Sequence, residues 1–180
     1  GRLRAVFGED PAWGAEDVHR RAIRVRRSTI RVEADEVTYP LHVILRYRLE
    51  RAMLAGDLVP ADLPGAWRDG MTALLGVAPE DDRDGCLQDI HWYFGAWGYF
   101  PTYTLGALAA AQFYDAAKTA VSGLEEALAE GDFRPLIGWL RSHVHEKGSL
   151  MSPSALIEAA SGKPLGTAVF KAHLEVRYPV

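Results

Sequence analysis

The spacing of apolar residues constrains the fold of this 180-residue chain more than any other feature, because that spacing is helical along most of the chain. After the stretch IRVEADEVTYP, apolar residues recur three or four positions apart and predict one side of a helix that ends near Gly56, with Pro40 in its first turn. These apolar residues are Leu41, Ile44, Leu45, Leu49, Ala52 and Met53. Alternation typical of strands is almost absent. The sequence therefore predicts an all-α fold.

Further helices are expected along the rest of the chain. They cover residues 62–76, 105–120, 123–132, 135–148, 152–162 and 164–177. Boundary signals support several of them: Gly76 and Gly148 follow apolar runs, while Ser152, Pro153 and Gly162 are suited to the N-cap, first-turn and C-terminal positions of one short helix. Repeats, low-complexity segments and an obvious linker are lacking, which favours a single helical domain over residues 1–180.

Composition excludes some classes of partner. Hydrophobic residues make up 48% of the chain and charged residues 24%, which is typical of a globular protein, and the formal net charge is −4. This charge gives no reason to expect a nucleic acid as partner. The basic run RRAIRVRRSTIR, Arg20–Arg31, contains aliphatic residues and is best interpreted as a solvated helix face or turn.

Cysteine content and hydropathy bear on location. Cys86 is the only cysteine, so an intrachain disulfide is impossible and a reducing compartment is favoured. An apolar run of the ~20 residues needed to span a bilayer is absent, as is the apolar stretch of a signal peptide. We therefore expect a soluble, cytoplasmic protein without a membrane partner. The first residue is not methionine, which is compatible with a piece of a longer protein.

One segment, GCLQDIHWYFGAWGYFPTYTLG at residues 85–106, combines polar and aromatic side chains at unusual density. A carboxylate or amide beside an imidazole can fix its tautomer, and an imidazole or phenol can then donate a hydrogen bond to a substrate carbonyl or oxyanion. Gln88 and Trp92 are four positions apart and would share a helix face. The candidate hydrogen-bonding groups are Gln88, Asp89, His91, Tyr99 and Tyr103.

Core packing is the alternative for this segment. For the aromatic residues it is the better interpretation, and for the adjacent Gln88, Asp89 and His91 the two interpretations are balanced, because three polar groups in an apolar stretch need partners.

A second polar group lies in IRVEADEVTYP, where Arg31 precedes Glu33, Asp35 and Glu36. An arginine held by a carboxylate can present a bidentate fork to a carboxylate ligand. The alternative is a helix N-terminus, where acidic residues are favourable and Arg31 pairs locally. Taken alone, these residues favour the alternative. Motifs for zinc, such as HExxH, and for serine nucleophiles, such as G-x-S-x-G, are absent.

Considered together, the two segments closely resemble the carboxypeptidase Taq family of zinc metallocarboxypeptidases. The family patterns are I-R-x-x-A-D and G-x-x-Q-D-x-H-W. Both patterns are met, by Ile30, Arg31, Ala34, Asp35 and by Gly85, Gln88, Asp89, His91, Trp92. The tail WLRSHVHEKGSLMSPSALIEAASGKPL also resembles the family's C-terminal helices.

The resemblance implies what the chain contains and what it lacks. Family members are longer helical, zincin-like enzymes whose zinc is held by an HExxH helix and a further glutamate, both N-terminal to the arginine motif. This chain has neither segment and corresponds to the C-terminal portion that closes the substrate groove. The resemblance implies zinc in the complete enzyme, no metal bound by this chain alone, a missing N-terminal zinc-binding half as partner, and a homodimer.

The resemblance also implies roles for the polar residues in removing residues from peptide C-termini. Arg31, oriented by Asp35, is expected to bind the substrate carboxylate together with a tyrosine. His91, oriented by Gln88 or Asp89, and Tyr99 or Tyr103 are the candidate catalytic groups that hydrogen-bond the substrate or oxyanion. Trp92 is included with the substrate-binding residues. Three hypotheses remain: an inert enzyme fragment, half of a split enzyme, or a non-catalytic helical peptide-binding or scaffolding module.

Overall fold

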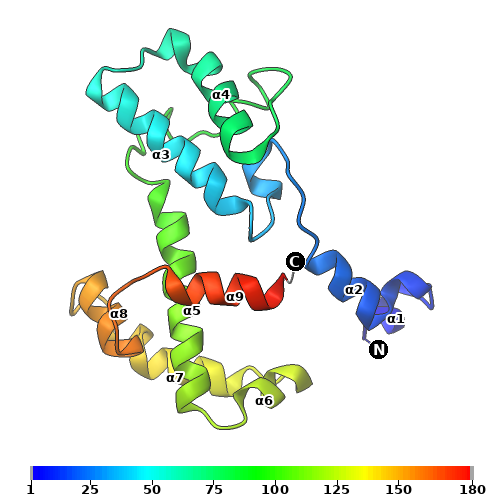
Figure 1. The fold of residues 1–180 in the computed structure, drawn as a ribbon. Helices are drawn as coiled ribbons and strands as arrows, with labels where there is room; N and C mark the ends of the chain where they lie inside the picture. The colour runs from blue at the N-terminus through cyan, green and yellow to red at the C-terminus, as the bar shows by residue number, and fades with distance from the viewer. Residues whose placement is uncertain (1, 179–180) are drawn as a thin grey trace. The chain divides into compact units, whose positions relative to one another are not determined.

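The computed structural model describes residues 2–178 and contains helices and connecting segments, without a strand in this range (Figure 1). The α-helices are α1 (Arg2–Phe7), α2 (Ala15–Ala22), α3 (Tyr39–Ala55), α4 (Leu63–Leu75), α5 (Pro101–Ala120), α6 (Leu124–Glu130), α7 (Arg134–His143), α8 (Pro153–Ser161) and α9 (Ala168–Arg177). Short 3₁₀ turns cover Pro11–Trp13, Arg31–Glu33, Pro60–Asp62 and His145–Lys147. The predicted all-α fold is confirmed. None of the helices in residues 2–178 is long and apolar enough to cross a membrane.

The chain forms two compact units, unit 1 at Gly1–Pro101 and unit 2 at Thr102–Val180. Each unit has its own cluster of buried apolar side chains. Compact units within one chain can belong to the same domain, so the single domain expected over residues 1–180 stays a prediction.

Unit 1 is built on the packing of α3 against α4. Its core consists of Leu45, Leu49, Trp67, Met71, Leu75 and Cys86. The helices approach so closely at Gly70 that a Cβ atom there would lie 2.3 Å from Leu45 Cδ1. Glycine at this position therefore permits the contact that forms the core. Both helices end as predicted, because Gly56 and Gly76 adopt left-handed conformations with φ of 81° and 68°.

The buried face of α3 is only partly apolar. Leu45 and Leu49 are buried as predicted, but the other predicted apolar residues of this helix are half-buried. Their place is taken by His42, Arg46 and Glu50, which are spaced four residues apart and are all buried. This polar stripe is the structural basis of the candidate site.

Unit 2 packs α5, α6 and α7 around Ala117, Leu124 and Trp139. Gln112 on α5 is 1% exposed, and its side chain fixes the connection from α8 to α9. Its Oε1 accepts a hydrogen bond from the Gly166 amide (2.8 Å), and its Nε2 donates to Ser161 Oγ (3.2 Å) and to the carbonyl of Pro164 (3.2 Å). Because residues 163–167 are held in this way, α9 begins at Ala168 and not near residue 164 as predicted.

Other boundaries in unit 2 differ less. The predicted capping of α8 is confirmed: Ser152 Oγ accepts from the Ala155 amide at 3.3 Å, Pro153 occupies the first turn and Gly162 has φ of 75°. The α5 helix begins at Pro101, four residues before the predicted start. The α7 helix ends at His143 because Val144 leaves helical geometry, and a 3₁₀ turn continues to Lys147.

The segment between α4 and α5 is a succession of turns and bends and contains no helix. The prediction that Gln88 and Trp92 share a helix face is therefore wrong. The basic run is divided: its first residues belong to α2, whereas residues 24–30 are irregular.

Candidate functional site

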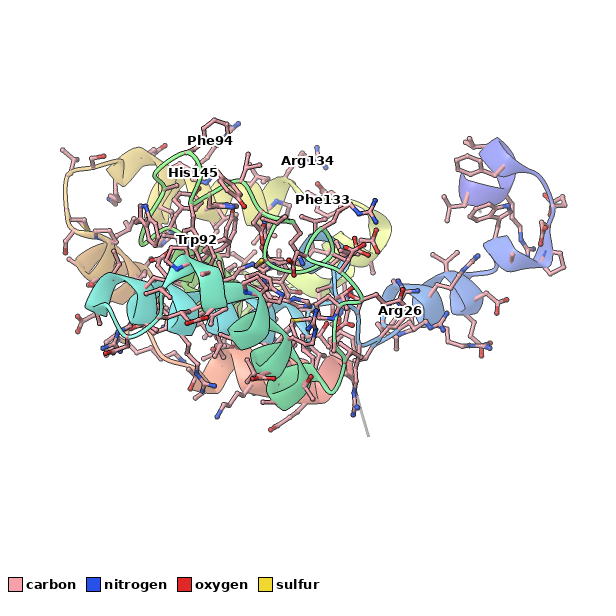
Figure 2. The ribbon with its side chains drawn as sticks, turned by 90° about the horizontal axis from the view of Figure 1, so that it is seen from above. Arg26, Trp92, Phe94, Phe133, Arg134 and His145 are labelled. Atoms are coloured by element: carbon pink, nitrogen blue, oxygen red, sulfur yellow. The ribbon has the colours of Figure 1, made fainter. Side chains whose placement is uncertain are left out.

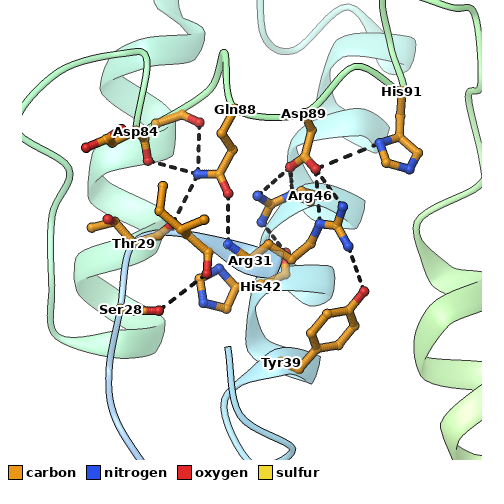
Figure 3. A network of polar contacts seen from close by, with 12 residues as sticks. Ser28, Thr29, Arg31, Tyr39, His42, Arg46, Asp84, Gln88, Asp89 and His91 are labelled. Carbon is orange, nitrogen blue, oxygen red and sulfur yellow. Dashed lines mark hydrogen bonds and ion pairs between the residues drawn. The ribbon is translucent and has the colours of Figure 1, made fainter. Parts of the chain in front are cut away.

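The two sequence motifs meet at Asp89, whose carboxylate lies between two arginines (Figure 3). Asp89 Oδ1 accepts from Arg31 Nε (3.1 Å) and Nη2 (2.8 Å). Asp89 Oδ2 accepts from Arg46 Nε at 2.5 Å, and Arg46 Nη2 lies at the same distance. One carboxylate thus neutralises part of the charge of two buried guanidinium groups.

Burial and mutual attraction decide the charge states of these three groups. Burial alone would raise the pKa of Asp89, but the two arginines outweigh it and lower the pKa below its usual range. Burial lowers the pKa of Arg46 to about 10, with Asp89 opposing the change. Burial also disfavours the charge on Arg31, yet the hydrogen bonds and charge of Asp89 leave its pKa raised. All three groups are therefore ionised at neutral pH.

Arg31 is 6% exposed and has a second anchor. Its Nη1 donates to the Tyr39 hydroxyl at 2.6 Å, and its guanidinium carbon lies 5.7 Å from the Tyr39 ring centroid and 5.8 Å from that of Phe100. The alternative prediction was that Arg31 pairs with an acidic residue nearby in sequence. This prediction is wrong, because the carboxylate that binds Arg31 is that of Asp89, 58 positions away.

Asp35 does not orient Arg31 through any contact that the structure displays. Its Oδ1 accepts from the amides of Val37 (3.0 Å) and Thr38 (2.9 Å), and its Oδ2 accepts from the Arg26 amide (2.7 Å). Burial raises the pKa of Asp35, but these hydrogen bonds outweigh it and leave the pKa lowered. Asp35 therefore shapes the turn before α3, and the carboxylate in contact with Arg31 is that of Asp89.

Gln88 joins the two motifs through the backbone. Its Oε1 accepts from the Arg31 amide at 2.9 Å, while its Nε2 donates to the carbonyls of Asp84 (2.8 Å) and Thr29 (3.1 Å). Both the oxygen and the nitrogen of the Gln88 side chain therefore make hydrogen bonds that hold residues 29–31 against residues 84–88. Of the two residues predicted to orient His91, Asp89 lies beside the imidazole and Gln88 is committed to the backbone.

His91 lies at the edge of this centre with its Nδ1 3.8 Å from Asp89 Oδ1. Its ring packs against those of Phe100 (centroids 4.4 Å apart) and Tyr99 (5.7 Å). Burial lowers the pKa of His91, Asp89 opposes this, and the charges of the two arginines add to the decrease. At neutral pH the imidazole is therefore mainly neutral and can act as both donor and acceptor. Tyr99, which is 48% exposed, brings a phenol to the same edge.

Trp92 faces inward from the same segment. Its Nε1 donates to Glu50 Oε2 at 2.7 Å, and the Gly98 amide donates to Glu50 Oε1 at 2.6 Å. The Trp92 ring packs edge-on against Trp67, with centroids 6.3 Å apart, and joins the core of unit 1. The structure thus gives Trp92 a packing role and identifies Glu50 as the residue that holds the turn from 92 to 98.

Four residues of the centre were not predicted from the sequence: Tyr39, His42, Arg46 and Glu50. His42 is fully buried, neither ring nitrogen has a hydrogen-bond partner within the described part of the chain, and burial together with the charges of Arg46 and Arg31 lowers its pKa to about 4. A signal was available, since polar residues at 42, 46 and 50 repeat at the spacing of one helix face.

One predicted site residue belongs to the other unit, and the buried cysteine, which was not predicted to belong to the site, is inert. Tyr103 is in the first turn of α5 and belongs to unit 2, whereas the other predicted site residues belong to unit 1. Cys86 is a buried free thiol whose pKa is raised by burial and by Asp82, so it is a poor nucleophile.

Residues 2–178 do not bring three histidine, cysteine or acidic side chains together in an arrangement that could hold a metal ion. A zinc site needs at least three such protein ligands converging on one point. The described residues therefore do not fit zinc by themselves, and the chemistry assigned to them below is limited to binding and orientation.

The fold is that of helical metallocarboxypeptidases. Trypanosoma cruzi metallocarboxypeptidase 1 superposes with a TM-score of 0.95 at 35% identity, over 99% of this chain and 38% of that structure. The M32 carboxypeptidase of Deinococcus radiodurans R1 gives 0.94 at 45% identity, over 99% of this chain and 36% of its own.

The family model described as carboxypeptidase Taq (M32) metallopeptidase matches residues 1–178, so the chain belongs to this family. Thermostable carboxypeptidase 1 of Thermus thermophilus is 46% identical over 177 residues, which are 98% of this chain and 35% of the relative. The chain thus spans about a third of the length of the relatives that it matches.

Proposed function

We propose that the chain supplies the substrate-groove portion of a zinc-dependent carboxypeptidase that removes residues from peptide C-termini. The observation that carries the proposal is the meeting of the two family motifs in one buried centre, where Asp89 is shared by Arg31 and Arg46. Such a centre fixes the backbone and side chains at its edge. Preorganised donors stabilise developing charge better than groups that must first be oriented.

In this proposal His91 and Tyr99 form hydrogen bonds with the peptide substrate. Asp89 faces Nδ1 of His91, so it favours the tautomer that keeps the proton on Nδ1 and leaves Nε2 as an acceptor for a substrate N–H group. Tyr99 can donate its phenolic proton to a carbonyl or to the oxyanion. Tyr103 remains a further candidate donor from α5. The metal and the general base come from polypeptide outside these 180 residues.

Arg31 remains the candidate for the terminal carboxylate, and its geometry suggests a second explanation. Three of its N–H groups are committed to Asp89 and Tyr39, which suits a residue that positions its neighbours. Under the proposal, Arg31→Ala in a complete enzyme lowers transition-state binding by on the order of 2–5 kcal/mol.

A chimera tests the proposal, in which this chain replaces the matching segment of the Thermus thermophilus relative. The isolated chain is expected to bind no stoichiometric zinc and to release no amino acid from peptides. The chimera is expected to bind one equivalent of zinc and to release C-terminal amino acids. A folded chimera that binds zinc and lacks peptidase activity would favour the non-catalytic peptide-binding module. Zinc bound at one equivalent by the isolated chain would contradict the proposal.

Arg31→Lys is the matched control for Arg31→Ala in this chimera. Both variants disturb the hydrogen bonds of Arg31 to Asp89 and Tyr39, but only Arg31→Ala removes the cation that would contact substrate. If Arg31 binds the carboxylate, Arg31→Ala lowers kcat/KM well beyond the loss seen with Arg31→Lys at similar stability. Parallel losses of activity and stability would assign Arg31 to positioning alone.

A further inference from the structure

The turn segment at residues 87–99, here called the aromatic loop, exposes many apolar side chains. Six large ones are at least 44% exposed: Leu87, Ile90, Tyr93, Phe94, Trp97 and Tyr99. Phe94 is 78% exposed and points away from the ribbon in Figure 2, whereas Trp92 lies against the helices. No Asp, Glu, Lys or Arg occurs from residue 90 to residue 114. Exposed apolar side chains concentrated in one segment are typical of an interaction site.

The aromatic loop is held in one conformation although its outer side chains are exposed. Glu50, 3% exposed, binds it at two points, Trp92 and Gly98. Gly95 and Gly98 adopt left-handed conformations with φ of 72° and 79°, which close the turn at little steric cost. The rings of Trp92 and Trp97 stack with centroids 5.9 Å apart.

A fixed conformation favours a docking surface over a disordered connection. Ordering a loop before contact removes part of the entropy cost of binding, and aromatic side chains dominate the buried centres of protein interfaces. A connection that served only to join α4 to α5 would need neither a buried carboxylate beneath it nor an uncharged outer face.

The lengths of the relatives point to one occupant. The three relatives named above align with 98–99% of this chain, but the matched segment is only 35–38% of their length. The remaining polypeptide of an M32 protein must pack against the matched segment, and an uncharged, preformed aromatic surface is chemically suited to contacts of that intramolecular kind. We infer that the aromatic loop docks the rest of the M32 polypeptide, joined to this chain or supplied separately. This inference rests on family membership and is independent of the proposed reaction.

Radical footprinting of Tyr93 and Phe94 by mass spectrometry tests the inference. The isolated chain at low concentration is compared with the chimera described above, and a peptide dosimeter normalises the radical dose. Modification of both side chains is expected to fall at least fivefold in the chimera. Phe100, which is 1% exposed, is the unreactive internal reference.

Three outcomes would overturn the inference. Equal reactivity of Phe94 in the chain and in the chimera would show that nothing docks there. Protection in the isolated chain as its concentration rises would identify a second copy as the occupant. Protection in the chimera only after a peptide is added would make the aromatic loop a wall of the substrate groove.

A variant gives a second measurement that does not depend on footprinting. Phe94→Ser is expected to leave Tm of the isolated chain unchanged, because the ring is largely in water, and to lower Tm of the chimera by roughly 3 °C or more. Phe133→Ser, at a residue 59% exposed in unit 2, is the matched control for an exposed phenylalanine of the isolated chain. A Phe94→Ser chimera with unchanged Tm would count against docking.

Discussion

The two units are organised around buried polar groups of different character. Unit 1 buries two arginines and the carboxylate that they share, whereas unit 2 buries a neutral amide, Gln112. Both groups join segments that are distant in sequence. A buried charge without its partner costs several kcal/mol, but a lost neutral hydrogen bond costs far less. The comparison teaches that the stability of unit 1 depends on a complete set of ionic partners. Unit 2 is expected to tolerate the loss of hydrogen bonds made by Gln112.

Asp89→Ala should have the largest effect on stability. It leaves two buried guanidinium groups without their shared carboxylate, and the free energy of unfolding is expected to fall by about 3–5 kcal/mol. Urea denaturation followed by tryptophan fluorescence measures the change. Asp132→Ala is the matched control, because the Asp132–Arg134 pair is exposed to solvent and is expected to contribute little. An Asp89→Ala variant as stable as this control would mean that the charged centre does not hold unit 1 together.

Acid should weaken unit 1 through His42. Its pKa is about 4 in the folded chain and about 6.5 in an unfolded one, so the unfolded state binds more protons between these values. The stabilisation that comes from keeping His42 neutral is complete above pH 6.5. It is lost as the pH falls toward 4, by on the order of 3 kcal/mol.

Urea denaturation of the wild-type chain and His42→Asn across this pH range measures that loss. The variant has no imidazole to protonate, so its stability should vary less between pH 6.5 and 4. Equal slopes for the two proteins would assign the acid sensitivity to other groups, such as Asp89 and Asp35, whose pKa values are lowered below the usual carboxylate range.

Gln112→Ala should have the smallest effect of the three changes. It removes the acceptor of the Gly166 amide and the donor to Ser161 Oγ and to the Pro164 carbonyl. The free energy of unfolding is expected to fall by about 1–3 kcal/mol. Hydrogen exchange at the Gly166 amide locates the change, because this amide should lose protection while the core amides of α7 keep theirs. A loss as large as that of Asp89→Ala would remove the distinction between charged and neutral centres.

The sequence predicts the parts of the fold that depend on neighbouring residues. The all-α class follows from apolar spacing, the ends of α3 and α4 from Gly56 and Gly76, and the start of α8 from Ser152. These features require only local chemistry at a helix terminus. The start of α9 was missed because it depends on Gln112, a residue more than fifty positions away from Gly166.

The candidate site divides in the same way. The residues of both motifs could be selected from the sequence, but which carboxylate holds Arg31 could not, since Asp35 is near in sequence and Asp89 is near in space. Arg46 was missed because a charged residue on an amphipathic helix normally faces water. Its burial is understandable only after Asp89 is placed beside it.

Asp89 closes long loops, 58 positions from Arg31 and 43 from Arg46. Closing these loops in an otherwise unfolded chain would cost conformational entropy. An ion pair that is still exposed to water would offset little of that cost. The neighbouring helices α3 and α4 are in contact and are joined by a short connection, so we expect their packing to precede that closure and to bring the separated segments together. We therefore expect the charged centre to be completed after the transition state for folding. Substitution of Asp89 is then expected to accelerate unfolding and to leave the rate of refolding almost unchanged.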